Sequence, residues 1–471
     1  MIDINHLDFS YPHYGKVAQN SSRFVLKDFS CSVRQGERLL IIAPPDSGKT
    51  TLAKILILGI PTYGGGELKG SFSIDGKQMS ELESYDLVET ISYIGQNPQE
   101  QLLMNTCSDE IIFPLEALGL EKQEIKRALI TSLEHWGLTQ LADVHPQELS
   151  GGERKRLLLA VSEAIDANVW ILDEVFDDLD DYYKQKLLTA LKERKGCSIT
   201  FASRFLPEFT NFFTSIGTIR EGSFSYISES EIVDEQIKEK KRKILREKHS
   251  SSHFLRMEDG IIVHERKSVK SGSVFTLNVD DFHVEQGEIV ALVGPNGSGK
   301  STLSRTLCGL DKIMQGTISV DNMAMNQHQL KERVGYLFQN PDYFLFLPTV
   351  FDELTFSLRS NTKMSHKEKE ELALECANLF HLNLTDNPTM MSYGERKRLQ
   401  AAVYYLLKRS FLIIDEIDSG ITYTQAYEII ARYQELGCGL IIISHDASFA
   451  SSLADRTYEI VDNHVLLRKK R

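Results

Sequence analysis

The sequence predicts two α/β domains in tandem, each built around a phosphate-binding loop. Three observations predict this. A strand pattern from Ile289 to Val293 runs into the loop G-P-N-G-S-G-K-S-T at 294–302, and a helical pattern from Thr302 to Leu310 leaves it. A weaker copy of the loop lies upstream at 43–51. The segments that follow each loop also recur, so one strand–loop–helix unit occurs twice.

The loop at 294–302 has the spacing G-x-x-x-x-G-K-S. Its glycines allow a tight curl in which successive backbone N–H groups point at phosphate oxygens. The helix N-terminus adds partial positive charge. Lys300 can reach the β- and γ-phosphates, and Ser301 can hold Mg²⁺. The residues predicted to bind ATP here are Gly294, Asn296, Gly297, Ser298, Gly299, Lys300, Ser301 and Thr302.

The repeat indicates a duplicated domain of about 220 residues. Three pairs of segments recur at an offset of about 242 positions: the glutamine segments 94–98 and 337–341, the signature segments L-S-G-G-E at 149–153 and M-S-Y-G-E at 391–395, and the acidic strand ends 170–174 and 412–416. The phosphate loops are offset by 251 (49 to 300). We assign the extra length in the first copy to the turn-like stretch 61–66.

The repeat divides the chain into a first domain at 1–228, a charged linker at 229–252 and a second domain at 253–471. The linker can be a solvated helix or a flexible tether. Helical patterns between the glutamine and signature segments, such as 109–136 and 367–382, predict a helical subdomain inserted into each α/β core.

Composition limits the class of protein. The formal charge of −13 over 471 residues disfavours nonspecific nucleic-acid binding. Six cysteines without metal-ligand spacing suggest a reducing, intracellular setting. No apolar run approaches the roughly 18 residues of a membrane span, and Met1-Ile2-Asp3 does not begin a signal peptide. We therefore expect any membrane role to come through a separate subunit.

These motifs, in this order, resemble the ATP-binding cassette (ABC) family over nearly the whole chain, twice. The segments 96–110 and 339–353 look most like the ATPases of energy-coupling factor (ECF) importers of vitamins and metal ions, because Gln-Asn-Pro is followed there by Thr-x-x-x-Glu. The family resemblance implies tandem P-loop NTPase domains, each with a RecA-like core, an antiparallel β subdomain and an inserted α-helical subdomain. It also implies that ATP lies between the phosphate loop of one domain and the signature segment of the other.

One of these two composite sites is complete. By the resemblance, Glu416 polarises the attacking water, His445 contacts the γ-phosphate and Gln339 completes the contacts to water and Mg²⁺. The expected metal-holding residues are Ser301, Gln339 and Asp415. The first copy adds Ser150, Gly151, Gly152 and Glu153 from its signature segment and Asp180 from the following acidic loop.

The other site is degenerate. Ala43 and Asp46 stand at glycine positions of its loop, and Asp46 adds a negative charge that faces phosphates. Arg204 aligns with the switch histidine, Tyr393 replaces the first signature glycine, and Thr422 replaces the acidic-loop aspartate. Residues that can still bind ATP here are Tyr11, Pro44, Ser47, Gly48, Lys49, Thr50, Thr51, Gln96, Asp173, Glu174 and Ser392. We interpret the pair as one hydrolytic site and one site that binds ATP without turnover; the alternative is tolerated variation with both sites active.

Several other residues have competing interpretations. Tyr11 either stacks on adenine or is a core residue at a strand end; in the second copy, His264 and Phe275 are both candidates for the stacking role. Trp170 is expected in the core. The basic run 154–156 is expected to be solvated. The basic tail 468–471 is expected to be a frayed terminus, with a position near anionic headgroups as the alternative.

The expected function is the ATP-hydrolysing subunit of an ECF-like importer for a vitamin or metal ion. It would use ATP and Mg²⁺ at the cytoplasmic face of the plasma membrane, with integral membrane subunits as partners and no nucleic acid. The alternative is a soluble tandem ABC ATPase that acts on ribosomes or nucleic acid, against which stand the net charge and the lack of a long basic arm. An exporter, or another importer type, is a third possibility. The sequence does not choose the cargo.

Overall fold

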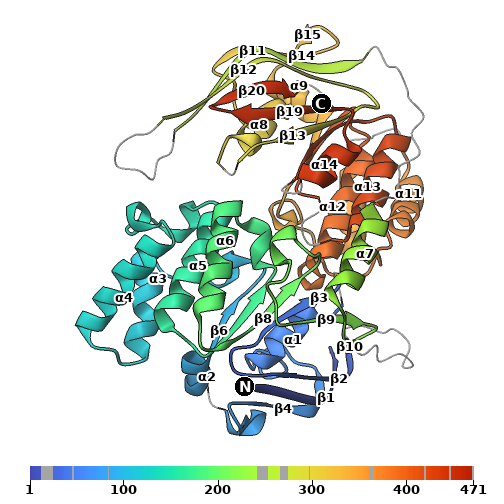
Figure 1. The fold of residues 1–471 in the computed structure, drawn as a ribbon. Helices are drawn as coiled ribbons and strands as arrows, with labels where there is room; N and C mark the ends of the chain where they lie inside the picture. The colour runs from blue at the N-terminus through green and yellow to red at the C-terminus, as the bar shows by residue number, and fades with distance from the viewer. Residues whose placement is uncertain are drawn as a thin grey trace. The chain divides into compact units, whose positions relative to one another are not determined.

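The computed structural model of the chain describes all residues except 12–24, 45–46, 83, 241–252, 266–273, 296, 360–363, 418–420, 445–446 and 469–471 (Figure 1). The chain forms two compact units, Met1–Ile237 and Lys238–Arg471. The boundary between them falls within the segment 229–252 that the sequence suggested as a linker, and helix α7 (Glu229–Lys240) occupies the first half of that segment.

Helix α7 is docked on the first unit. Its Ile232 is buried in a hydrophobic cluster of that unit, and the Gln236 side chain exchanges two hydrogen bonds of 2.8 Å with the backbone of Phe205. Glu229 accepts a further bond from the Asn211 N–H at 3.0 Å. The start of the predicted linker is therefore neither a solvated helix nor a flexible tether, because its Ile232 side chain packs into the core of the first unit.

The first unit holds two sheets. The antiparallel sheet has the order β2-β1-β4-β5, with β1 Ile2–Ser10, β2 Leu26–Val33, β4 Glu67–Ile74 and β5 Lys77–Gln78. The six-stranded sheet has the order β10-β9-β3-β8-β7-β6, with β3 Arg38–Ile42, β6 Ile91–Ile94, β7 Val169–Asp173, β8 Cys197–Ala202, β9 Ser215–Arg220 and β10 Ser223–Tyr226. All its pairings are parallel except β9 with β10.

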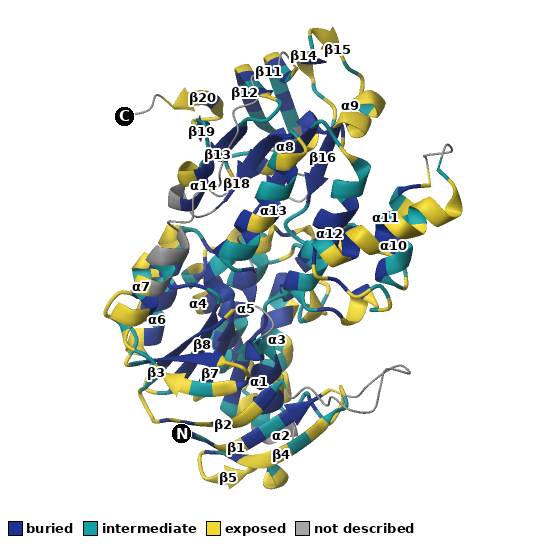
Figure 2. Ribbon diagram, turned by 90° about the vertical axis from the view of Figure 1, so that its right-hand side faces the viewer, coloured by how far each residue is buried: buried dark blue, intermediate teal, exposed yellow. Residues whose placement is uncertain are grey.

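The parallel strands are buried on both faces, as their unbroken apolar runs predict. In β3, Leu39 and Ile41 join the cluster beneath the antiparallel sheet, whereas Leu40 and Ile42 join the cluster beneath the helices. Figure 2 shows β7 and β8 as dark blue ribbons, in contrast to the yellow stretches of β4 and β5. Because β3, β7 and β8 are parallel, their carboxyl ends lie at one edge of the sheet, where the phosphate loop begins.

Helices surround the sheets of the first unit. They are α1 Lys49–Leu56, α2 Ser84–Thr90, α3 Cys107–Ala117, α4 Lys122–His135, α5 Gly151–Ile165 and α6 Asp181–Glu193. Helices α3, α4 and α5 pack against one another, and Figure 1 shows α3 and α4 to one side of the sheet. They form the predicted helical subdomain, and Trp136 and Leu133 lie in its core.

The second unit repeats this plan, but its two sheets are joined. The order is β15-β14-β11-β12-β20-β19-β13-β18-β17-β16, and the join is one parallel bridge between Asn278 of β12 and His464 of β20. The antiparallel strands are β11 Phe254–Glu265, β12 Val274–Glu285, β14 Gln315–Val320 and β15 Met323–Ala324. The others are β13 Ile289–Val293, β16 Val334–Leu337, β17 Phe411–Asp415, β18 Gly439–Ile443, β19 Arg456–Val461 and β20 His464–Arg468.

The helices of the second unit are α8 Lys300–Leu307, α9 Gln327–Arg333, α10 Val350–Ser357, α11 His366–Leu379, α12 Tyr393–Leu407, α13 Tyr423–Glu435 and α14 Ala447–Leu453. Helices α10, α11 and α12 pack together as the inserted helical subdomain. The fold class predicted from the sequence is confirmed: each unit has a P-loop NTPase core, an antiparallel β subdomain and a helical insertion.

One detail of the duplication differs from the prediction. Lys49 to Ile74 spans 25 positions, and Lys300 to Val320, its counterpart by strand pairing, spans 20. Three more of the extra residues lie after β4, so the stretch 61–66 does not hold the whole difference. Among the described residues no helix is both long and apolar enough to span a membrane.

Candidate nucleotide-binding sites

The phosphate loop of the second unit joins β13 to α8. Lys300 opens α8, and its Nζ donates to the carbonyl oxygens of Gly294 and Pro295 at 2.7 and 2.9 Å, so the side chain folds back over the loop. Gly299 has a φ of +106°, and a Cβ there would lie 2.7 Å from the Phe275 ring. Only glycine meets both conditions, which explains its place directly before the lysine.

This loop carries polar groups that suit a phosphate. Ser298 Oγ is buried and has no hydrogen-bond partner in the described part of the chain. Burial lowers the pKa of Lys300, and the nearby carboxylates of Glu416 and Asp415 only partly offset that effect. An anionic ligand would stabilise both the buried ammonium and the unbonded hydroxyl. Asn296 lies outside the described residues.

The carboxylate expected to act on water follows β17. Glu416 has a left-handed backbone with a φ of +52°, and its N–H donates to the Ile443 carbonyl at 2.9 Å. The Gln339 side-chain amide donates to Glu416 Oε2 at 2.5 Å. The structure thus brings together two of the three residues predicted to act in catalysis. The third, His445, lies outside the described residues.

The donor types expected around Mg²⁺ are present in both units. In the first unit, Thr50 Oγ1 donates to Asp173 Oδ2 at 2.7 Å, and Asp173 Oδ1 is buried without a hydrogen-bond partner among the described residues. In the second unit, Asp415 Oδ2 accepts from the Tyr336 hydroxyl at 2.6 Å. Within the described ranges no group of three or more His, Cys, Asp and Glu side chains could hold a metal alone. Such sites suit a cation that phosphate oxygens help to bind.

Both signature segments begin a helix with the same capping box. Ser150 Oγ accepts from the Glu153 N–H at 3.4 Å, while Glu153 Oε2 accepts from the Ser150 N–H at 2.8 Å. Ser392 and Glu395 repeat this pattern at 3.2 and 2.9 Å. Tyr393 therefore does not disturb the start of α12. Each segment presents a helix N-terminus, which favours anions.

Asp180 lies at the start of α6, where Oδ1 accepts from the Tyr183 N–H at 2.9 Å. Its counterpart Thr422 caps α13 in the same way, with Oγ1 accepting from the Gln425 N–H at 3.2 Å. Threonine and aspartate are both good N-cap residues. The aspartate-to-threonine difference between the units therefore keeps the helix cap and changes only the charge.

The phosphate loop of the first unit keeps the shape of its counterpart where it is described. Gly48 has a φ of +97° and a Cβ there would lie 2.8 Å from Leu26. Ser47 Oγ is buried without a partner in the described ranges, and Lys49 Nζ donates to the Pro44 carbonyl at 2.9 Å. Residues 45–46 lie outside the described part of the chain.

The carboxylate of the first unit is held differently. Lys49 Nζ lies 3.4 Å from Glu174 Oε1, and both side chains are buried. Glu174 also accepts from the hydroxyl and the N–H of Ser203, at 2.5 and 3.0 Å. Burial raises the pKa of Glu174, and Lys49 opposes the rise. Glu174 is thus bonded to its own loop lysine and to Ser203.

Comparison with known proteins identifies the family. The family model described as "ABC transporter" matches residues 26–177 and 277–419, one match in each unit. The chain belongs to the ABC transporter family. It is an ABC ATPase with two cassettes in one chain.

Its relatives agree with this assignment. A protein of Treponema denticola, provisionally named an ABC transporter ATP-binding protein, is 28% identical over 99% of this chain and 96% of its own length. A Bacillus subtilis protein, provisionally named HMP/thiamine import ATP-binding protein YkoD, is 26% identical over 98% of this chain and 90% of its own. A chain in a structure of ribosome-bound archaeal Pelota and ABCE1 is 17% identical, with a TM-score of 0.64 over 98% of this chain and 78% of that one. That last likeness is one of fold alone.

The strand register of this ABC ATPase corrects the position of Arg204. Phe201 and Ile443 are equivalent, because they accept the N–H of Glu174 and of Glu416 respectively. Two residues after each lie Ser203 and the switch-position His445, so Ser203 and not Arg204 stands at the histidine position. The offset of 242 positions between the copies gives the same register, because it places His445 opposite Ser203.

Arg204 has a different role. Its guanidinium Nη2 lies 3.2 Å from Asp177 Oδ1, and both side chains are about nine-tenths buried. A buried ion pair of this kind holds the loop after β7 against the loop after β8. The expectation that Arg204 replaces the switch histidine is therefore wrong.

The sequence suggested that the basic run on the signature helix is solvated, but its charged groups are bonded to the protein instead. Lys155 is fully buried and donates to the carbonyls of Gly95 and Gln96, both at 2.9 Å. Arg156 donates to the Trp136 carbonyl at 2.8 Å, and Arg154 to carbonyls that precede the helix. The charged groups donate hydrogen bonds to backbone carbonyls at three loop ends instead of to water. A charge pattern by itself does not reveal such contacts.

Tyr11 lies at the mouth of the first-unit loop. Its hydroxyl is 3.2 Å from Thr51 Oγ1, its ring packs edge-on against Phe9, and it is 42% exposed. This exposure excludes the core interpretation and leaves a ring face available beside the loop. In the second unit Phe275 lies under Gly299 and is half-buried, while the side chain of His264 is outside the described residues. Trp170 is buried, as expected.

The segment after each glutamine is held by a buried glutamate. Glu353 Oε1 accepts from the N–H groups of Phe346 and Leu347 at 2.5 and 2.7 Å, and Glu110 Oε1 accepts from the Met104 N–H at 2.6 Å. Burial raises the pKa of Glu110. These bonds present apolar side chains to solvent, with Phe346 68% exposed and Leu103, its counterpart in the first unit, 77% exposed.

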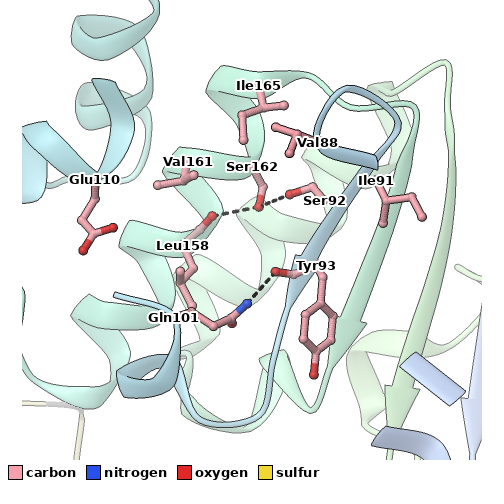
Figure 3. Close-up of a pocket in the computed structure, with 10 residues that line it drawn as sticks. All are labelled: Val88, Ile91, Ser92, Tyr93, Gln101, Glu110, Leu158, Val161, Ser162 and Ile165. Carbon is pink, nitrogen blue, oxygen red and sulfur yellow. Dashed lines mark hydrogen bonds between the residues drawn. The ribbon is translucent and has the colours of Figure 1, made fainter. Parts of the chain in front are cut away.

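A small cavity of about 220 Å³ lies behind the glutamine segment of the first unit (Figure 3). Gln101 closes one side, where its amide donates to the Tyr93 carbonyl and accepts from the Gly95 N–H. Ser92 and Ser162 bond to each other across its base at 2.7 Å. The cavity lies between β6 and α5.

Sequence reasoning missed three residues that contact the predicted sites: Ser203, Lys155 and Lys397. Ser203 carried no motif. The two lysines carried a usable signal, because they recur at the same place after each signature segment. A charged residue that repeats at one helical position in both copies indicates a shared structural contact.

Proposed function

We propose that this chain is the ATP-hydrolysing subunit of an ECF-like importer, in which the two units together form one hydrolytic and one degenerate ATP site. The observation that supports the asymmetry is that the substituted motif positions, Ala43, Asp46, Tyr393 and Thr422, all belong to one composite site. In the unit that supplies the loop of that site, Glu174 contacts Lys49 and Ser203.

At the hydrolytic site, the second-unit phosphate loop would meet the signature segment of the first unit. Lys300 and the loop N–H groups bind the β- and γ-phosphates, and Ser150 with the N-terminus of α5 approaches the γ-phosphate from the other side. Glu416, positioned by Gln339, orients the water for in-line attack. Mg²⁺, held by Ser301, Asp415 and Gln339, would neutralise phosphate charge.

At the degenerate site, nucleotide must compete with contacts within the first unit. Lys49 can reach a phosphate only by loosening its contact with Glu174. Both carboxylate oxygens of Glu174 accept hydrogen bonds from Ser203, which compete with a water for the same oxygens. Both contacts oppose turnover, whereas Thr50, Asp173 and Tyr11 remain available for binding. We infer that ATP binds here and is hydrolysed slowly or not at all.

Coupling to a membrane partner would pass through the segments that follow Gln96 and Gln339. Each presents exposed apolar residues on a backbone that a buried glutamate holds. An exposed apolar side chain on a rigid backbone suits docking to another protein. The Bacillus subtilis relative named for HMP/thiamine import supports import as the direction. We place the chain at the cytoplasmic face of the plasma membrane, with integral membrane subunits as partners and a vitamin or metal ion as cargo.

The asymmetric assignment is tested with matched isosteric changes in the full chain. Glu416→Gln should lower ATPase kcat by about 100-fold or more, because it removes the carboxylate that acts on water. Glu174→Gln, the same change at the equivalent place in the first unit, should leave most of the activity. Equal losses from both changes would contradict the proposal.

The importer assignment is tested by tagging the chain and recovering it from detergent-solubilised membranes of its own organism. We expect one or more integral membrane proteins to copurify. Substituting the exposed apolar residues, as in Leu103→Ser with Phe346→Ser, should release them without lowering basal ATPase activity. Recovery with ribosomes and no integral membrane protein would show that the alternative function is correct.

A further inference from the structure

Tyr393, the residue that breaks the second signature segment, makes a specific contact within its own unit. It occupies the first turn of α12, directly after the N-cap Ser392. Its hydroxyl donates to the backbone carbonyl of Gln339, 54 residues away. Glycine, present at the equivalent position 151 of the first unit, has no side chain to make this bond.

The same helix makes a second contact with the hydrolytic residues. Lys397, one turn after Tyr393, is 3% exposed and donates through Nζ to the backbone carbonyl of Glu416. Its ammonium also lies 5.2 Å from the centre of the Tyr393 ring, within range of a cation–π interaction. Two neighbouring side chains of one helix thus hold the backbones of the two residues expected to act on water.

These contacts close into a ring of four residues. Tyr393 bonds Gln339, the Gln339 side chain bonds Glu416, Lys397 bonds Glu416, and Lys397 faces the Tyr393 ring. In such a network each contact restricts the next, so loss of one member shifts the others. The backbones of Gln339 and Glu416 are thus both held by α12, and their side chains are bonded to each other.

The first unit lacks this ring and uses its lysine differently. Lys155, the counterpart of Lys397, donates to the carbonyls of Gly95 and Gln96. In the second unit the equivalent glutamine carbonyl receives the Tyr393 hydroxyl, and the lysine reaches the glutamate carbonyl. The glutamine carbonyl thus accepts a hydrogen bond from the signature helix in each unit, from Lys155 in the first and from Tyr393 in the second.

We propose that Tyr393 is a positioning residue for hydrolysis: it holds the backbone of Gln339, and with Lys397 it fixes Glu416 in the geometry that acts on water. From the sequence, Tyr393 looks like damage to a signature segment. By this proposal it is instead a functional replacement. The inference rests on the proposed assignment of hydrolysis to Glu416.

The test compares steady-state ATP hydrolysis by full-length variants. Tyr393→Phe removes only the hydroxyl, and we expect kcat to fall by about three- to tenfold, the range of one lost hydrogen bond. The KM for ATP should stay nearly constant, because the phosphate loop is untouched. Tyr405→Phe is the matched control: it removes a hydroxyl from the same helix, where the ring packs against Phe380 and Tyr433.

A second comparison separates positioning from general stability. In a Gln339→Ala background, Tyr393→Phe should lower kcat little further, because Tyr393 acts through Gln339. If Tyr393→Phe acted through general stability, its effect on kcat would instead multiply with that of Gln339→Ala.

A third variant separates replacement from damage. Tyr393→Gly restores the S-G-G pattern of the first unit, yet we expect it to lower kcat at least as much as Tyr393→Phe. Unchanged kcat in Tyr393→Phe, or increased kcat in Tyr393→Gly, would overturn the inference while an inactive Glu416→Gln still supports the proposed function. An active Glu416→Gln would overturn both.

Discussion

Substitution of Lys155 measures how much a buried charge on the signature helix contributes to the free energy of unfolding of the first unit. Lys155→Met keeps most of the aliphatic chain but removes the ammonium that donates to the Gly95 and Gln96 carbonyls, both at 2.9 Å. A hydrogen bond to a charged group contributes about 1.5–3 kcal/mol, and the two carbonyls would remain buried without a donor. We expect the free energy of unfolding of the first unit to fall by about 3–5 kcal/mol.

The sequence supplies a selective probe for this measurement. The chain has two tryptophans, Trp136 and Trp170, and both are buried in the first unit. Tryptophan fluorescence therefore follows urea unfolding of that unit within the full-length protein. With a urea dependence of about 3 kcal/mol per M, the midpoint should fall by about 1 M or more.

Lys397→Met is the matched control, because it removes the equivalent ammonium from the second unit. It should shift the tryptophan-detected transition less than Lys155→Met, while circular dichroism should show a second unfolding step that moves. A midpoint for Lys155→Met within about 0.2 M of wild type, or about 0.5 kcal/mol, would refute the reasoning. It would mean that the ammonium is solvated, as the basic run 154–156 suggested by itself.

Two further predictions concern Arg204 and Lys300. Arg204→Met should lower the tryptophan-detected stability by about 3–5 kcal/mol, because it leaves Asp177 buried without its partner; lower nucleotide affinity with unchanged stability would instead show a phosphate contact. Burial lowers the pKa of Lys300, and bound phosphates should raise it again, so ATP binding should take up protons at alkaline pH. Affinity should then fall as the pH rises through the lowered pKa of Lys300 in the free protein, which calorimetry in buffers of different ionisation enthalpy can check; proton release on binding would contradict this assignment.

The fold could be predicted largely from the sequence because its signals are local. An apolar strand, a glycine-rich turn and a helix start lie within about 20 residues around Lys300, and the same order recurs around Lys49. The inserted helical subdomain followed from helical periodicity between two repeated segments. Chain order and hydrophobic pattern are enough to specify these elements.

The details of the sites depend on register and packing. One residue of strand register separates Ser203 from Arg204 at the switch position, and the pairing of Asp173 with Phe201 in adjacent strands selects Ser203, in agreement with the offset of 242 between the copies. Helix α7 looked like a linker because most of its residues are charged, yet a single buried Ile232 and the Gln236 amide dock it. Composition averages over residues, whereas docking depends on one or two.

The sequence by itself determined the family's chemistry: two phosphate loops, two strand-end carboxylate pairs, and losses that fall on one set of partners. Only the tertiary structure decided which groups each carboxylate meets. Glu174 and Glu416 follow the same strand in the two units, but one contacts Lys49 and Ser203 and the other Gln339. The reason is physical, because these contacts join residues 29 to 125 positions apart in the chain. Packing of the strand ends brings such residues together, and no local pattern encodes which side chain arrives.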